Sequence, residues 1–338
     1  SNTKIILSGF AFWDLFDKGP LTDQQIEQKI QESIDYYPPE DARKSASADL
    51  RHVLAFNERI LQEKDYFDEA EFHLLSNYTA IEGTVDWIRR RMRKNGYEKP
   101  IWAGDAGATI QIPSHNRVGR WAIFNTVNLF YPPLYDDGDK IFEVLTSKKN
   151  KYGYSYEKVS KWVYKEQVNY LAKSLVIEME QGLKGTNIFT WLDADPTFWM
   201  PGPFKNWQIQ GLREGNYSRL EVGKPKPVFY TYKMIIQKLE RFSSAEKISL
   251  ENKQIQAYKF IVQEKPIYVL WYDDGVNQGP GEKDAKIEFD FKTDLNGVKI
   301  SPVITEIGQT ESKTEIKTAQ NGAVSLTLSE IPVFVEGK

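Results

Sequence analysis

Strand-like and helix-like segments alternate over residues 1–245, and this alternation constrains the fold more than any other feature of the chain. Short apolar runs predict strands at residues 4–11, 66–73, 101–105 and 186–191. Helical patterns predict helices at residues 22–36, 45–62, 79–94, 156–181 and 227–241. Strands that are each followed by a helix pair in parallel through right-handed crossovers. The sequence therefore predicts an α/β domain built on a parallel sheet.

The character of the sequence changes near Ser243, where short alternating strands take over. Turn signals separate these strands at Asp273-Asp274-Gly275, Leu295-Asn296-Gly297 and Asn321-Gly322. We therefore expect two domains: the α/β domain over residues 1–243 and an antiparallel β-sandwich of about eight strands over residues 244–338. A long excursion at about residues 106–155 interrupts the first domain, and loops of such length are usually functional.

The helix expected at residues 79–94 carries two further predictions. Thr79 and Glu82 have the spacing of a capping box, so we expect Thr79 to cap the helix. The basic run at residues 89–94 is expected to be a solvated helix end. A net charge of −3 with mixed signs disfavours nucleic acid as a partner.

Composition excludes several other classes of function. Without cysteine, the chain has no disulfide, no thiol catalysis and no thiolate metal site. The histidines His52, His73 and His115 are too scattered for a zinc motif, so we expect neither a metal nor an organic cofactor. No apolar run reaches the ~18 residues of a membrane-spanning helix, and no signal-peptide pattern is present.

Several segments together resemble the clan A glycoside hydrolases, which are (β/α)8 barrels, with the β-xylosidase/α-iduronidase-like group as the most similar. The string YFDEAEFHLLSNYTAIEGTVDWIRRRMRKNGYEKPIWAGDAG at residues 66–107 resembles their sixth strand, sixth helix and seventh strand. TNIFTWLDAD at residues 186–195 resembles the eighth strand, and GKPKPVFYTYKMIIQKLE at residues 223–240 the last helix. IYVLWYDDG at residues 267–275 and LTLSEIPVFVE at residues 326–336 resemble the appended β-domain.

This resemblance makes KIILSGFAFW, at residues 4–13, the fifth barrel strand. The chain would then carry strands five to eight of a TIM-type barrel, followed by the β-sandwich. Four strands alone leave open edges and an uncovered apolar interior. We therefore expect an N-terminal segment missing here, or a second chain, to complete the barrel, and a pairing of two half-barrels is a third arrangement.

The resemblance also implies a catalytic position. The family cleaves with retention through two glutamates, and its nucleophile position after strand seven falls on Asp105 in PIWAGDAG. Aspartate is one methylene shorter than glutamate, which puts activity in doubt. The acid/base glutamate follows an asparagine at strand four, whereas the pair Asn57-Glu58 falls in a helix. Asp193 and Asp195 are substitutes for which capping or turn roles are more common.

Five further residues are candidates for substrate binding. His73 is the last residue of the strand expected at residues 66–73. It could hydrogen-bond to Asp105 or to a sugar hydroxyl, and the alternative is a histidine packed in the core. Glu71 shares its face by strand alternation. Trp191 occupies the position where the family stacks an indole beneath the sugar, with core packing as the alternative. Asn77, in the glycosylation-type triplet Asn77-Tyr78-Thr79, and Trp199 complete the set.

These features predict a glycoside hydrolase-like protein, derived from a retaining glycosidase that acts on a polysaccharide or oligosaccharide. Its ligand would be a carbohydrate, and its location extracellular or at the cell surface. Because the acid/base half is absent, this chain alone is expected to be inactive. The alternative is a catalytically inactive protein that binds carbohydrate or has a structural role in the cell envelope.

Overall fold

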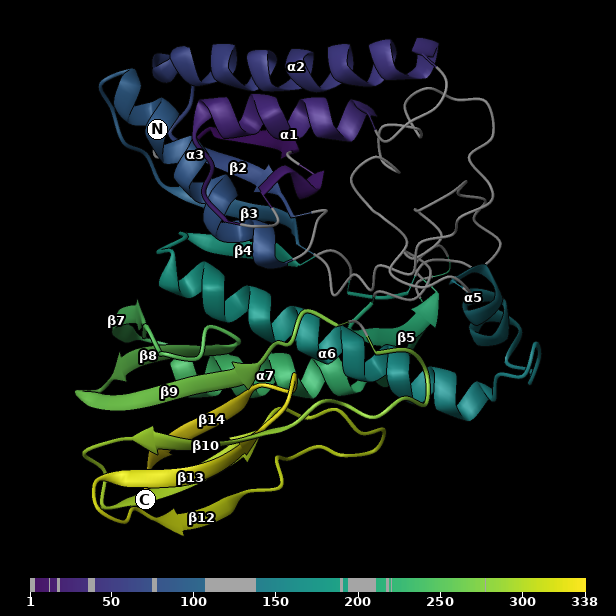
Figure 1. Ribbon diagram of the computed structural model, residues 1–338, viewed down its shortest axis with the longest axis vertical. Coiled ribbons are helices and arrows are strands. Elements are labelled where there is room, and N and C mark those ends of the chain that lie inside the picture. The colour runs from purple at the N-terminus through teal and green to yellow at the C-terminus, as the bar shows by residue number, and fades with distance from the viewer. Residues whose placement is uncertain are drawn as a thin grey trace. The chain divides into compact units, whose positions relative to one another are not determined.

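The computed structural model describes residues 4–11, 13–16, 19–35, 40–74, 78–106, 138–188, 191–193, 211–216, 219, 221–276 and 278–338. The chain divides into two compact units, each formed by two stretches of sequence (Figure 1). The first comprises Ser1–Phe142 and Leu183–Gly211, and the second comprises Glu143–Gly182 and Leu212–Lys338. Each unit has its own sheet.

The first unit contains a four-stranded parallel sheet of order β1-β2-β3-β4. Its strands are Ile6–Ala11 (β1), Glu69–His73 (β2), Ile101–Ala106 (β3) and Gly185–Ile188 (β4). The parallel pairing predicted from the strand–helix alternation is confirmed. Strand β4 is described as far as Ile188, and the strand predicted at residues 186–191 continues into residues outside the described part of the chain.

Three helices accompany this sheet, together with short 3₁₀ helices. They are Asp23–Asp35 (α1), Glu40–Gln62 (α2) and Ile81–Lys94 (α3), with Trp13–Phe16 (η1), Lys64–Tyr66 (η2) and Tyr78–Ala80 (η3). The predicted apolar stripe of α3 is buried: Ile81, Val85, Ile88 and Met92. The predicted capping box is wrong, because Thr79 lies inside η3. The residue at the N-cap position of α3 is Ala80, which makes no side-chain capping hydrogen bond.

The basic end of α3 holds the helices of this unit together. Arg91 is buried and its Nη2 donates to Asp23 Oδ1 of α1 at 2.9 Å, while Lys94 Nζ donates to Glu58 Oε1 of α2 at 2.9 Å. Arg90 Nε donates to Asp86 Oδ2 within α3 at 2.7 Å. The prediction of a solvated helix end is therefore wrong for the buried Arg91, whereas the side chain of Lys94 is 66% exposed and agrees with it. Glu58 is accounted for as a structural ion-pair partner.

The second unit contains most of the antiparallel structure. A six-stranded sheet has the order β12-β11-β14-β9-β8-β7, and β10 pairs with β13 in a two-stranded sheet. The strands are Phe242–Lys247 (β7), Ile255–Val262 (β8), Lys265–Tyr272 (β9), Ile287–Lys292 (β10), Gly297–Pro302 (β11), Glu315–Thr318 (β12), Ala323–Leu328 (β13) and Val333–Gly337 (β14). One buried apolar cluster joins side chains of both sheets, including Leu270, Phe291, Val298, Leu326 and Val335.

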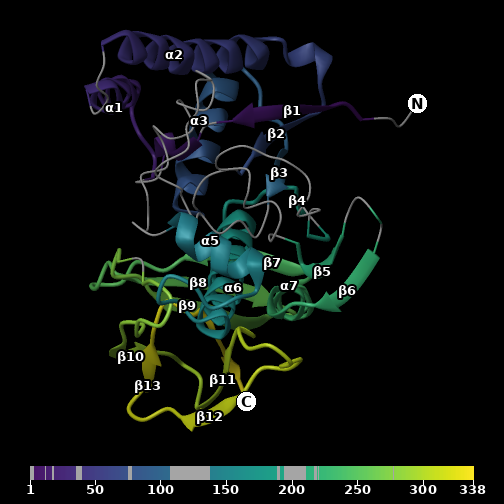
Figure 2. The same cartoon turned by 90° about the vertical axis from the view of Figure 1, so that its right-hand side faces the viewer.

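Two long helices belong to the same unit. Tyr156–Glu180 (α6) and Pro227–Leu239 (α7) lie side by side (Figures 1 and 2), and a hairpin of Arg213–Asn216 (β5) and Glu221–Pro225 (β6) precedes α7. A further helix, Gly138–Ser147 (α5), occupies part of the long excursion expected at residues 106–155. The unit therefore includes helices that the sequence assigned to the first domain, whose predicted end was residue 243.

A cluster of charges connects α6 to the loops that follow β9 and β13. Lys165 Nζ lies 2.6 Å from Asp284 Oδ1, 2.5 Å from Glu330 Oε1 and 3.4 Å from Glu166 Oε1. Burial, together with repulsion from Glu330, raises the pKa of Glu166 to about 7. Three carboxylates thus share one ammonium group, and the pKa of the buried Glu166 lies above its ordinary value.

We predict that Glu166 makes the stability of this unit depend on pH. Its pKa in the folded chain lies above the ordinary value of 4.5, so its contribution is complete below that pH and is lost as the pH rises through about 7. The free energy of unfolding should fall by about 3 kcal/mol over this range. Urea unfolding at several pH values should show a flatter profile for Glu166→Gln. Glu157→Gln, at an exposed acid of the same helix, should keep the wild-type slope, and equal slopes for all three proteins would contradict the assignment.

Candidate functional site

The carboxyl ends of β1 to β4 meet at one edge of the parallel sheet. Ligands of parallel α/β folds bind outside this edge, because the loops that follow the strands converge there. His73 is the last residue of β2, Asp105 is the next-to-last residue of β3, and Trp191 follows β4 by three positions. The sequence candidates therefore come from three neighbouring strands.

Glu71 and His73 form a polar pair on one face of β2. His73 Nε2 lies 3.5 Å from Glu71 Oε1, and the two side chains are 25% and 17% exposed. The prediction that they share a face is confirmed. Residues Ala70 and Phe72, which alternate with them, are buried on the opposite, apolar face. The pair is thus fixed on the sheet while part of each side chain stays accessible.

Gly104 creates the space in which the Glu71 carboxylate lies. His73 pairs with Gly104 across the strands, and a Cβ built on Gly104 would lie only 1.6 Å from Glu71 Oε1. The side chain of Glu71 therefore passes over the backbone of β3 at Gly104. The Cβ of any other residue at this position would occupy the space of the carboxylate. Gly104 was not among the site residues expected from the sequence, although a glycine inside a strand often marks such a close approach.

A second contact of this kind lies next to the first. Trp102 of β3 covers Gly185 of β4, where a built Cβ would lie 2.3 Å from Cζ3 of the indole. Trp102 Nε1 donates to Glu69 Oε2 at 2.5 Å, and Lys4 Nζ donates to Glu69 Oε1 at 2.6 Å. The Lys4 hydrogen bond, followed by that of Trp102, holds the pKa of Glu69 below its usual value. Glu69 thus remains a carboxylate that anchors the indole.

The backbone of β3 is irregular at the predicted nucleophile position. Ala103 pairs with Thr186 and Ala106 with Ile188, so three steps along β3 match two along β4. A bulge of this kind changes the direction of side chains and is common beside active sites. Asp105 lies within it, and the prediction for its carboxylate falls outside the described residues, as do those for Asn77, Asp195 and Trp199.

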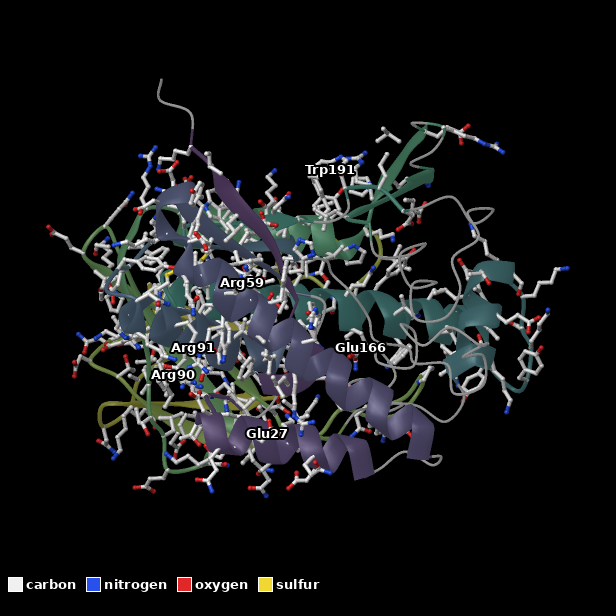
Figure 3. The ribbon with its side chains drawn as sticks, turned by 90° about the horizontal axis from the view of Figure 1, so that it is seen from above. Glu27, Arg59, Arg90, Arg91, Glu166 and Trp191 are labelled. Carbon is white, nitrogen blue, oxygen red and sulfur yellow. The ribbon has the colours of Figure 1, made fainter. Side chains whose placement is uncertain are left out.

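Trp191 and Asp193 follow β4. The Trp191 side chain is 51% exposed (Figure 3), which is not the environment of a core residue. Asp193 Oδ1 accepts a hydrogen bond from the Gly211 amide at 2.9 Å. Asp193 therefore has the loop-stabilising role that the sequence favoured, and Trp191 is half-exposed.

Among the described residues, no group of three or more histidine, aspartate or glutamate side chains is arranged to hold a metal ion. No helix in the described part of the chain combines the length and apolar character needed to cross a membrane.

Comparison with known proteins gives similarity only at the level of solved structures. No family model matches the chain, and no curated protein matches it. A GH30 endoxylanase from Clostridium papyrosolvens C71 is 9% identical, with 81% of this chain and 50% of that chain covered and a TM-score of 0.39. A β-porphyranase of glycoside hydrolase family 86 from Bacteroides plebeius is 14% identical, with coverages of 81% and 42% and a TM-score of 0.41.

A glucosidase from Croceicoccus marinus is a third similar structure, with 8% identity, coverages of 96% and 77% and a TM-score of 0.40. The chain spans half of the endoxylanase and less than half of the porphyranase. The chain is thus similar, at low identity, to structures of glycoside-cleaving enzymes.

Proposed function

We propose that this chain binds a neutral oligosaccharide or polysaccharide at the carboxyl edge of β1 to β4, and that this edge is the sugar-binding part of a glycosidase-type site. The observation that carries the proposal is the accessible Glu71–His73 pair laid across Gly104. The resemblance of residues 66–107 and 186–195 to clan A glycoside hydrolases supports it.

The chemistry of these side chains suits a sugar. A carboxylate accepts hydrogen bonds from two hydroxyl groups, and a neutral imidazole both donates and accepts one. The indole of Trp191 offers a flat apolar surface for the C–H face of a pyranose ring. Pockets for such ligands combine apolar surface with a few placed polar groups, as this edge does.

Hydrolysis requires a further group. Retaining cleavage uses two carboxyl groups about 5–5.5 Å apart. We assign the nucleophile position to Asp105 and expect the acid/base from a further segment or a second chain that continues the sheet into a (β/α)8 barrel. The antiparallel strands would form the appended β-sandwich. The complete protein would act outside the cell or at its surface.

Calorimetric titration with xylohexaose, cellohexaose and mannohexaose tests the binding function. Glu71→Gln and His73→Ala should each weaken the binding of the preferred sugar by about tenfold. Product analysis by chromatography then separates the two functions. Turnover that disappears in Asp105→Asn supports a hydrolase, whereas binding without turnover supports the inactive carbohydrate-binding protein that an aspartate at this position favours. Absence of binding by every hexasaccharide would contradict the proposal.

Trp191→Ala should weaken hexasaccharide binding by about tenfold, because it removes the stacking surface. The melting temperature should not change, since the side chain is half-exposed. Tyr66→Ala is the matched control: Tyr66 is 74% exposed and precedes β2, at the opposite end of that strand. The same titration measures both variants. Equal loss in the two, or no loss in Trp191→Ala, would exclude the indole from the site.

A further inference from the structure

The second unit contains a groove that the proposed site does not use. It has a volume of about 620 Å³ and lies between the six-stranded sheet and β10. This volume is within the range of ligand pockets, which is roughly 300–1,000 Å³. Its lining residues are Glu246, Ile248–Asn252, Lys259, Tyr268 and Phe289–Lys292.

The floor of the groove is aromatic and firmly supported. Tyr268 packs edge-on against the buried Phe291, with ring centroids 4.9 Å apart, and Phe289 lies 6.4 Å from Phe291. Tyr268 and Phe289 are partly buried against the core of the unit, as are Ile248 and Leu250. A surface of this kind holds its shape without a ligand and leaves ring area accessible.

The walls of the groove are polar and carry both signs of charge. Glu246, Lys259 and Tyr268 form one row across β7, β8 and β9, since each pairs with the next. Lys259 Nζ lies 3.1 Å from Glu246 Oε1. Asp290 and Lys292 alternate with the aromatic residues of β10 and are exposed. The two signs nearly balance, which disfavours a strongly charged ligand and provides donors and acceptors for hydroxyl groups.

We propose that this groove is a second saccharide-binding site, which takes a short stretch of a neutral glycan with its pyranose rings on Tyr268 and Phe289. The choice of ligand class rests on the proposed function of the first unit, whereas the groove and its residues are independent of it. Two sites on one chain would let the protein hold a polysaccharide at a second point in addition to the sheet edge.

Methyl NMR of the full chain with ¹³C-labelled isoleucine and leucine tests this proposal, because Ile248 and Leu250 line the groove. Titration with xylohexaose, cellohexaose and mannohexaose should shift both methyl signals saturably for at least one sugar. Phe289→Leu, which keeps apolar volume but removes the ring, should weaken this response by about tenfold. Phe242→Leu, a change at a β7 aromatic that does not line the groove, should leave it unchanged.

The controls separate this site from the first. In Glu71→Gln and Trp191→Ala, the sugar-induced shifts of the Ile248 and Leu250 signals should persist. If these shifts occur but no sugar binds at the edge of the parallel sheet, only the proposed function is overturned. Unshifted Ile248 and Leu250 signals with all three sugars would overturn the second site, even if calorimetry shows binding elsewhere. Self-association that depends on Phe289, measured by light scattering, would identify the groove as a protein interface and would also overturn it.

Discussion

Replacing Gly104 by valine should abolish saccharide binding by the first unit, with an affinity loss of at least about 100-fold. Even a Cβ at this position would lie 1.6 Å from Glu71 Oε1, so the carboxylate must leave the position it holds beside His73. Overpacking should also destabilise the unit by about 1–3 kcal/mol. Calorimetric titration and urea unfolding measure the two effects separately.

Two further variants identify the cause of the Gly104 effect. If the clash with Glu71 is responsible, Gly104→Ala should lower the free energy of unfolding much less in a Glu71→Ala background than in the wild type. The added methyl group then has no carboxylate to displace, so the effects of the two substitutions are not additive. Gly297→Ala is the matched control, since the nearest atom to a Cβ built on Gly297 is Lys338 Cβ, at an ordinary contact distance of 3.7 Å. Unchanged sugar affinity in Gly104→Val would show that Glu71 is not part of the sugar-binding site.

Thr231→Val should destabilise the second unit by about 2–4 kcal/mol, although it preserves the shape of the side chain. Thr231 on α7 is completely buried, and its Oγ1 donates to the Ile304 carbonyl at 2.9 Å. The same oxygen accepts a hydrogen bond from the Ile304 amide, also at 2.9 Å. Valine leaves a buried donor and a buried acceptor of the strand-following loop without partners, and each costs free energy.

Hydrogen exchange followed by mass spectrometry locates this effect. Amides around Ile304 should exchange faster in Thr231→Val, in proportion to the lost stability. Thr231→Ser keeps the hydroxyl and loses only a methyl group, so it should retain most of the protection. Equal exchange in wild type and Thr231→Val would show that the reciprocal hydrogen bonds do not hold α7 to this loop.

Local sequence patterns were sufficient for the parallel sheet and the main helices. Alternation of apolar runs with helical periodicity located all four strands of the first unit, because both signals are carried by neighbouring residues. The capping role expected of Thr79 was wrong, because the local sequence does not show that Thr79 lies inside the 3₁₀ helix that precedes α3.

The contacts that build the candidate site depend on strand register, which a single sequence does not reveal. Glu71 and His73 were recognisable as neighbours on one face because strand alternation is local. The passage of Glu71 over Gly104 and of Trp102 over Gly185 required knowledge of which residues pair. The hydrogen bond of Lys4 to Glu69 joins residues far apart in the chain. Gly104, which lies within a predicted strand, was the signal that could have indicated the first crossing, whereas Gly185 lies just before the strand predicted at residues 186–191.

The central claim is that a saccharide binds beside His73 at the carboxyl edge of the parallel sheet, and the imidazole signal of His73 tests it most directly. The chain has three histidines, so the imidazole Cε1–H spectrum is assigned with one His→Gln variant each. Titration with the preferred hexasaccharide should shift the His73 signal saturably and leave that of His52, exposed on α2, in place. A His73 signal that stays fixed while calorimetry shows sugar binding would contradict the account.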